Sequence, residues 1–265
     1  MSQLIDIGAN LAHKSFDTDR DQVIADAVAA GVTQIVVTGS CLESNHSAHK
    51  LTLNHPGQLF STAGCHPHHA KDYSDELHQQ IETLAALEQV VAIGECGLDY
   101  NRNYSPHQAQ QDAFEQQLTL AASLKKPLFL HQRDAHEPFL EQFSNHRDQI
   151  TDAVVHCFTG NQTELYAYLD LDLYIGVTGW ICDERRGQHL QELVKNIPAN
   201  RLLLETDAPY LLPRDLKPKP SHRRNEPKYL PHIAKIVAHC RDQSLGNFCQ
   251  QTLQNTRAFF NLLAT

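Results

Sequence analysis

The chain has 265 residues, which suits one large α/β domain better than two small ones. Its formal net charge of −9 argues against a general affinity for nucleic acid or anionic membranes, although it is compatible with a local basic loop. No apolar run approaches the roughly 18 residues of a membrane span, and the N-terminus has no basic segment leading into an apolar one. We therefore expect neither a transmembrane helix nor a signal peptide.

The cysteine content indicates a reducing compartment. The seven cysteines are odd in number and form no C-x-x-C pair, and several lie in or beside apolar segments. Buried thiols of this kind are typical of cytosolic proteins, in which disulfides are rare. We therefore expect a cytoplasmic protein with reduced cysteines.

Eight apolar segments of strand length alternate with helical patterns along the chain. We expect strands at residues 4–8, 34–39, 59–65, 90–95, 127–131, 153–157, 173–176 and 201–205. We expect helices at 19–30, 42–54, 75–86, 106–124, 137–144, 163–169 and 187–195, and two closing helices at 228–241 and 245–263. Eight β/α units in about 260 residues predict an α/β protein, a single (β/α)8 TIM-barrel domain over residues 1–265. A doubly wound open sheet is the alternative, but no G-x-G-x-x-G motif follows the first strand.

The segment V-V-A-I-G-E-C-G-L-D-Y at residues 90–100 carries the clearest chemical signal. Its apolar start predicts a buried parallel strand, and the strand ends in the carboxylate of Glu95 between Gly94 and Gly97. An unpaired buried carboxylate is costly, so Glu95 needs a partner. That partner is a metal ion, a cationic substrate or a neighbouring arginine.

Similar polar residues stand at the ends of other predicted strands. In a barrel, such residues converge on one mouth, where activity is found. Four of them are good ligands for a divalent metal: Glu95, His131, His156 and Asp207. A single histidine of this kind more often has a structural role, but four ligand-type residues at four strand ends predict a shared metal site. Such a site suits a divalent ion such as Mg²⁺, Mn²⁺ or Zn²⁺.

Further polar residues suggest roles around this site. His66 and His68 follow the third strand and are candidates for metal ligands, for donors to an anionic substrate or for turn stabilisation. Asp207 is a candidate general base, because a carboxylate beside a metal-bound water can accept its proton. Glu205 is expected to orient a neighbour.

The loop at residues 214–226 is a basic patch on an acidic protein. It holds five Lys or Arg residues and two acids, and it is stiffened by prolines. Loops after the last strands of a barrel often bind phosphate, and Arg223 and Arg224 are suited to phosphate oxygens. The residues 183–186 after the seventh strand extend the patch. Trp180 and Tyr210 flank it and are candidates for stacking on bases, with core packing as the alternative.

Five motifs together resemble the TatD family of metal-dependent deoxyribonucleases. They are G-x-H-P-H at 64–68, G-E-x-G-L-D at 94–99, His131 followed by Arg133, H-C-F-T-G at 156–160 and E-T-D-A-P-Y-L at 205–211. The resemblance covers essentially the whole chain. It implies a TIM barrel of the metallo-dependent hydrolase type, a divalent metal and 3′–5′ exonuclease activity on single-stranded DNA. It also makes Arg133 a candidate substrate contact.

One position departs from the family pattern. Many relatives carry His-x-His at the end of the first strand, where this chain has Gly8 and Asn10. The resemblance then implies one metal, or a second one that is weakly held, with Asn10 supporting its neighbours. Mg²⁺ keeps several waters and takes few protein ligands, so it fits such a depleted site.

We therefore predict a nuclease that hydrolyses phosphodiester bonds of single-stranded DNA. The sequence leaves activity on RNA open, and DNA repair, DNA turnover and nucleotide scavenging all fit as its setting. We expect a monomer without a membrane partner. One alternative is an amidohydrolase-like enzyme acting on a small amide or ester, since the same barrel and ligands serve that chemistry. Another is a non-catalytic nucleic-acid-binding barrel, which the missing His-x-His motivates.

Overall fold

Eight strands form one sheet in chain order in the computed structural model, which describes residues 3–262. They are β1 (Leu4–Ala9), β2 (Val32–Val37), β3 (Leu59–Ala63), β4 (Val90–Asp99), β5 (Leu128–Arg133), β6 (Ala153–Val155), β7 (Tyr174–Val177) and β8 (Leu202–Leu204). Pairs such as β1–β2, β4–β5 and β7–β8 are parallel, and an additional parallel bridge joins Ala9 to Ala208 beyond β8. The predicted (β/α)8 barrel is confirmed.

The helices alternate with the strands as expected. They are α1 (Arg20–Ala29), α2 (Leu42–Asn54), α3 (Asp75–Ala85), α4 (His107–Leu124), α5 (His136–His146), α6 (Gln162–Asp170), α7 (Gln188–Leu193), α8 (Leu230–Cys240) and α9 (Leu245–Phe260). Most boundaries agree with the sequence predictions to within two residues. The last helix was expected to reach residue 263, which lies outside the described residues. None of the helices in the described range is long and apolar enough to cross a membrane.

The chain packs as two compact units, and the prediction of one domain over 1–265 stays a prediction. The first unit holds the residues up to Val37, residues 157–165 and those from Ile175 onward. The second holds residues 38–156 and 166–174. Each unit is described by itself.

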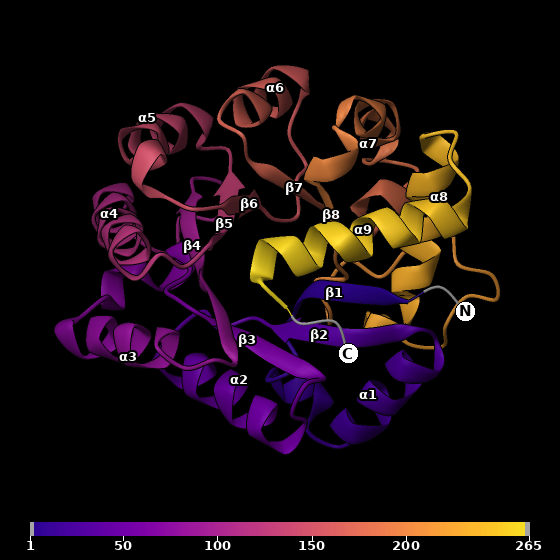
Figure 1. The fold of residues 1–265 in the computed structure, drawn as a ribbon, viewed down its shortest axis with the longest axis horizontal. Helices are drawn as coiled ribbons and strands as arrows, with labels where there is room; N and C mark the ends of the chain where they lie inside the picture. The colour runs from indigo at the N-terminus through magenta and orange to yellow at the C-terminus, as the bar shows by residue number, and fades with distance from the viewer. Residues whose placement is uncertain (1–2, 263–265) are drawn as a thin grey trace. The chain divides into compact units, whose positions relative to one another are not determined.

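In the first unit, α9 packs against β1 and β8 (Figure 1, yellow). Its Asn255 side chain donates hydrogen bonds to the carbonyl oxygens of Ala199, at 2.7 Å, and Leu202, at 2.9 Å. These contacts satisfy backbone carbonyls at the start of β8. The helix therefore covers the amino-terminal end of this strand, and the candidate residue Asp207 follows the opposite end.

In the second unit, α4 packs against β4 with Phe114 and Leu118 fully buried. Two buried glutamines on this helix hold the segments that follow β3 and β4. Gln117 accepts the N–H of Cys65 at 2.7 Å, and Gln110 accepts the N–H of Asp99 at 2.8 Å. Because they are seven residues apart, they lie on the same face of the helix. This face fixes the two segments that carry most of the candidate metal centre.

The glycines on either side of Glu95 permit a close approach to β5. Gly94 and Gly97 have φ angles of 141° and 138°, which residues other than glycine rarely adopt. A Cβ on Gly94 would collide with the carbonyl oxygen of Phe129, and one on Gly97 with that of His131. The β4–β5 pairing therefore requires glycine at both positions, and it brings His131 beside the Glu95 strand.

Candidate metal centre

One carboxylate oxygen of Glu95 faces three imidazole rings. Its Oε1 atom lies 2.8 Å from Nε2 of His156, 2.9 Å from Nδ1 of His131 and 3.2 Å from Nε2 of His66. Glu95, His66 and His156 are buried, and His131 is partly exposed. The structure thus brings together three residues that the sequence singled out as ligands and His66, which the sequence suggested as a ligand, a donor or a turn-stabilising residue.

The ionisation of Glu95 reflects these neighbours. Burial favours the neutral carboxyl, but the surrounding imidazoles outweigh it and hold the pKa of Glu95 well below its usual value. Burial also lowers the pKa of the His66 imidazole to about 4, so this ring is neutral near pH 7. The centre therefore offers a carboxylate and at least one neutral imidazole.

The tautomer of His66 follows from its other nitrogen. The backbone N–H of His68 donates to Nδ1 of His66 at 3.0 Å. In a neutral ring the proton is then on Nε2, the nitrogen that faces Glu95. His66 therefore acts as a hydrogen-bond donor in this arrangement, the role that suits an anionic oxygen.

His131 lies between two carboxylates. Its Nδ1 faces Glu95, and its Nε2 lies 3.2 Å from Oδ2 of Asp99. Burial lowers the pKa of His131, but the bonds to Asp99 and Glu95 outweigh this and raise it overall. A carboxylate on the far nitrogen fixes the ring and strengthens the near nitrogen as a ligand.

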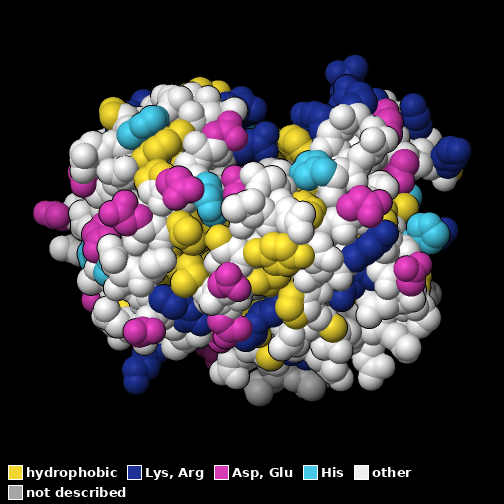
Figure 2. Space-filling model, turned by 90° about the horizontal axis from the view of Figure 1, so that it is seen from above, with side chains coloured by type: hydrophobic (Ala, Val, Ile, Leu, Met, Phe, Trp, Pro, Cys, Tyr) yellow, Lys and Arg dark blue, Asp and Glu magenta, His cyan; other side chains and the backbone are white. Residues whose placement is uncertain are grey.

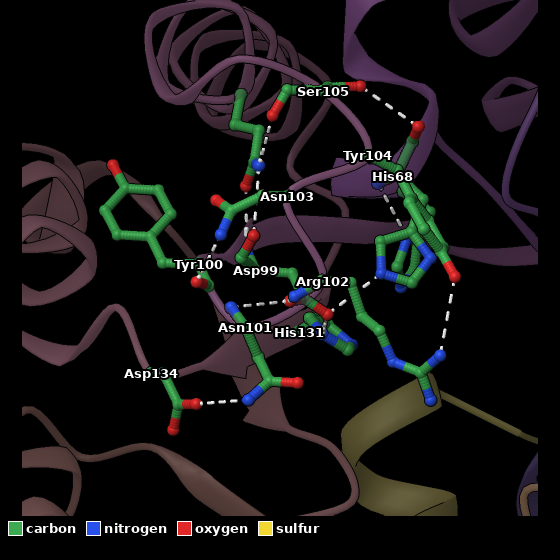
Figure 3. Close-up of polar contacts among 12 residues, drawn as sticks. His68, Asp99, Tyr100, Asn101, Arg102, Asn103, Tyr104, Ser105, His131 and Asp134 are labelled. Carbon is green, nitrogen blue, oxygen red and sulfur yellow. Dashed lines mark hydrogen bonds and ion pairs between the residues drawn. The ribbon is translucent and has the colours of Figure 1, made fainter.

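Asp99 is a site residue that our sequence analysis did not single out. It also accepts from the backbone N–H groups of Asn101 and Arg102, at 3.0 and 2.8 Å, and lies 2.9 Å from Nε2 of His68 (Figure 3). Burial favours its neutral form, but these bonds hold the pKa of Asp99 well below its usual value. The signal was present in the G-L-D end of the fourth strand, which runs four residues further than expected.

The donor set suits a divalent cation. Ligand atoms of His66, Glu95 and His131 lie within 4.8 Å of one another, and His156 reaches the same Glu95 oxygen. Imidazole nitrogens with a carboxylate oxygen are ligands for Zn²⁺, Mn²⁺ and related ions. These residues therefore form a candidate metal site. Because Nε2 of His66 carries a proton, the better ligands are Glu95, His131 and His156.

Asp207 belongs to the first unit and follows β8, with a left-handed φ of 54°. Its backbone N–H donates to the carbonyl oxygen of Gly8 at 2.9 Å. The side-chain amide of Asn10 donates to Oδ1 of Asp207 at 3.1 Å. Gly8 and Asn10 thus hold Asp207 in place. Glu205, two residues earlier, accepts the N–H of Cys157 at 2.5 Å.

Asp6 is a second residue that the sequence analysis missed. It is fully buried and accepts from the N–H and hydroxyl of Thr206, at 2.9 and 2.5 Å, and from the N–H of Gly8 at 3.3 Å. Burial raises the pKa of Asp6 to about 7. The sequence around Asp6 did not point to this residue, because its hydrogen-bond partner Thr206 is 200 residues away in the chain.

The two arginines of the predicted phosphate loop have different surroundings. Arg224 pairs with Asp19 at 2.6 Å and with Glu226 at 2.9 Å, and donates to the carbonyl oxygen of Ser15 at 2.6 Å. Arg223 instead lines a cavity of about 600 Å³. Arg224 therefore ties its loop to Ser15 and Asp19, whereas Arg223 is available to a ligand in the cavity.

The cavity has a basic lining. Its charged residues are Asp183, Arg185, Arg186, Arg214, Lys219 and Arg223. The buried Asp183 neutralises part of this charge, since Arg185 and Arg186 both lie 3.0 Å from it. Arg186 also lies over the ring of Trp180, 4.2 Å from its centroid. Lysine and arginine side chains gather at the upper right of the face in Figure 2, although the chain as a whole is acidic.

The remaining candidates lie near strand ends. Arg133 ends β5, where its carbonyl oxygen accepts the N–H of Tyr100 at 2.9 Å. Tyr210 is 51% exposed, and its ring lies 6.1 Å from that of His13.

Comparison with known proteins places the chain in a family. The model of a family described as TatD related DNase matches residues 5–261. The 3′-5′ ssDNA/RNA exonuclease TatD of Yersinia pseudotuberculosis is 52% identical over 260 residues, which cover 98% of this chain and 100% of that protein. The protein of the same name from Klebsiella pneumoniae is 52% identical over 259 residues, 98% of each chain.

Solved structures agree with this placement. A hydrolase of the TatD family from Entamoeba histolytica has a TM-score of 0.89 at 28% identity, with 99% of each chain covered. The TatD homolog YJJV from Escherichia coli has a TM-score of 0.88 at 26% identity, again with 99% of each chain covered. The chain belongs to the TatD family of related DNases.

Proposed function

We propose that this protein is a metal-dependent nuclease that removes nucleotides from the 3′ end of single-stranded DNA and RNA. The observation that carries the proposal is the convergence of three imidazole nitrogens on one buried oxygen of Glu95, in a chain of the TatD family. The names of its bacterial relatives, 3′-5′ ssDNA/RNA exonuclease TatD, support the polarity and the substrates.

We assign the cation to Glu95, His131 and His156. Mg²⁺ is the proposed ion, with Mn²⁺ and Zn²⁺ as alternatives, and the number of ions is proposed to be one. When bound, a divalent ion supplies a Lewis acid for a phosphoryl oxygen and lowers the pKa of a bound water. Asp99 holds His131 in the orientation that this requires.

We assign the proton-accepting role to Asp207, on the strength of the family motif at 205–211. A carboxylate is a competent base toward an activated water. Asn10 holds Oδ1 of Asp207 through its amide, and Glu205 fixes the N–H of Cys157. Both residues therefore position their neighbours and take no part in bond making.

Four side chains are proposed to bind the substrate phosphates. His66 presents the Nε2–H toward the centre, and His68 lies beside it with ring centroids 4.2 Å apart. Arg133 and Arg223 are proposed to hold flanking phosphates as charge-assisted donors. Arg224, which the sequence suggested for the same role, is proposed to act through the loop that it anchors.

The proposed setting is the cytoplasm, with the protein as a monomer. Free thiols at Cys41, Cys65, Cys96, Cys182 and Cys240 support a reducing compartment. Size-exclusion chromatography coupled to light scattering measures the oligomeric state.

The activity is tested with single-stranded oligonucleotides that are labelled at either end. With Mg²⁺, the wild-type protein should release nucleotides from the 3′ end, and Glu95→Ala should release none while its circular dichroism spectrum is unchanged. A protein that never cleaves DNA or RNA with Mg²⁺ or Mn²⁺, or a Glu95→Ala variant with full activity, would contradict the proposal.

A further inference from the structure

An exposed aromatic side chain stands beside the histidine group. Tyr104 is 55% exposed. The centroid of its ring lies 4.7 Å from that of His68, and the two planes are inclined at 70° (Figure 3). The edge of one ring therefore supports the other, while much of the tyrosine ring remains accessible.

The loop that carries Tyr104 is held in one conformation by buried hydrogen bonds. Ser105 is 1% exposed; its hydroxyl donates to the carbonyl oxygen of His68 at 3.0 Å and accepts the N–H of Lys71 at 3.1 Å. Gln110 donates to the carbonyl oxygen of Ser105 at 2.9 Å. Asp99 fixes the start of the loop through two backbone N–H groups. The ring is thus pre-positioned, which lowers the entropic cost of a contact with a ligand.

A cation accompanies the ring. The exposed Arg102 donates from Nη1 to the hydroxyl of Tyr104 at 3.4 Å (Figure 3). An aromatic face with a neighbouring guanidinium is the combination by which proteins hold single-stranded nucleic acid, since every base has a π-face and every nucleotide a phosphate. A core-packing role does not explain Tyr104, because the side chain is more than half exposed.

Two imidazole rings connect Tyr104 to the candidate metal centre. Tyr104 contacts His68, the His68 and His66 ring centroids are 4.2 Å apart, and Nε2 of His66 lies 3.2 Å from Oε1 of Glu95. The ring is thus separated from Glu95 by two imidazoles.

We propose that Tyr104 is a stacking platform for one nucleobase of the single-stranded substrate, close to the reacting phosphate, and that Arg102 steadies the ring and attracts the backbone. The proposal rests on the proposed nuclease function and adds a binding site to it. Because stacking is independent of base identity, the platform serves DNA and RNA alike. Paired bases are already stacked on each other, so the platform favours single strands.

The test combines variants of Tyr104 with substrates that lack one base. Single-stranded oligonucleotides carry an abasic nucleotide at the first, second or third position from the 3′ end, and kcat and KM are measured with Mg²⁺. Tyr104→Ala should lower kcat/KM about 10-fold on the intact oligonucleotide, within the range for one base–aromatic stack. Tyr104→Phe, which keeps the ring, should stay within about twofold of the wild type.

The decisive readout is the interaction between the two changes. At one abasic position, removal of the base should lower kcat/KM of the wild-type enzyme about as much as Tyr104→Ala lowers it on the intact oligonucleotide. For the Tyr104→Ala enzyme, removal of the same base should change kcat/KM very little. Tyr166→Ala, at another exposed tyrosine (42% exposed), serves as the matched control and should behave as the wild type throughout.

The outcomes separate this proposal from the general function. If the wild type cleaves but Tyr104→Ala matches it, or if both enzymes lose equally at all three abasic positions, the platform is wrong and the nuclease assignment is unaffected. If the wild type cleaves no nucleic acid, the proposed function itself fails. Thermal unfolding of each variant excludes a loss caused by misfolding.

Discussion

Asp99 Oδ2 lies 3.2 Å from Nε2 of His131, the ring whose other nitrogen faces Glu95. This relationship links the loop after β4 to the candidate metal centre, because the same carboxylate also orders Asn101 and Arg102. The Asp99 side chain thus positions the proposed metal ligand His131 and also fixes the loop that follows β4.

Asp99→Asn should weaken metal binding without removing it. The amide still accepts from the loop N–H groups, but it offers no negative charge to His131 and its NH₂ faces that ring. Loss of such an outer partner typically costs about 10–100-fold in metal affinity or activity. The measurement is a titration of activity with Mn²⁺, in which the half-saturating concentration should rise and excess Mn²⁺ should restore part of kcat. An unchanged titration curve would show that Asp99 does not act through His131.

Asn10→Ala should lower kcat and leave KM nearly unchanged. Its amide donates to Oδ1 of Asp207 at 3.1 Å, and a misplaced base slows the chemical step without affecting substrate contacts. We expect a loss of roughly 10-fold in kcat, which is less than the roughly 10²–10⁴-fold contribution of general acid–base catalysis, because the base is displaced and not removed. Steady-state kinetics on a 3′-labelled oligonucleotide measure both constants. A change confined to KM would instead make Asn10 a substrate contact.

Arg224→Ala and Arg223→Ala should separate a structural arginine from a binding one. Arg224 pairs with Asp19 and with Glu226, which is 2% exposed, so its removal leaves a buried carboxylate with fewer partners. We expect Arg224→Ala to lower the free energy of unfolding by about 1–3 kcal/mol.

Arg223→Ala should leave the unfolding transition unchanged, raise KM and weaken the dependence of KM on salt concentration, because one phosphate contact is lost. Thermal unfolding and kinetics at two salt concentrations give both readouts. A stable Arg224→Ala variant with a raised KM would restore Arg224 to the substrate contacts that the sequence suggested.

Asp6 should make the protein less stable as the pH rises toward neutrality. Burial raises the pKa of its carboxyl from 3.8 to about 7, so the folded protein retains a proton that the unfolded chain has lost. The free energy of unfolding contributed by this group is therefore fully present below about pH 4 and falls as the pH passes through about 7. At about 1.4 kcal/mol per pKa unit, the loss is on the order of 4 kcal/mol.

Asp6→Asn should remove this slope, since the amide oxygen can accept the N–H of Thr206 and the NH₂ group can donate to its hydroxyl. Urea unfolding of both proteins between pH 4 and pH 8 gives the comparison. Parallel pH profiles for the two proteins would show that Asp6 does not titrate in this window.

The barrel was predictable because it depends on local patterns. Strands that are buried on both faces read as apolar runs, and His156 directly follows such a strand, β6. Glu95, which the apolar pattern placed at the end of its strand, lies within β4 instead. The resemblance to the TatD family added the activity. The contacts of Arg224 were not predictable, because Asp19 is 205 residues away in the chain and only folding brings the two together.

Asp99 and Tyr104 were missed for a related reason. The sequence suggested a strand ending at residue 95, but pairing with β5 continues it to Asp99. Tyr104 follows in a polar loop that has no periodic signal, and its position depends on the buried Ser105 and on His68. Tertiary hydrogen bonds, not local propensity, define these residues.

The central claim is that Glu95, His131 and His156 hold one divalent cation. The most direct measurement is the anomalous scattering of Mn²⁺ in crystals of the protein soaked with this ion. Our account predicts a single strong peak within ligand distance of Glu95, His131 and His156, and its disappearance in Glu95→Ala crystals. A peak elsewhere, or none at saturating Mn²⁺, would contradict it.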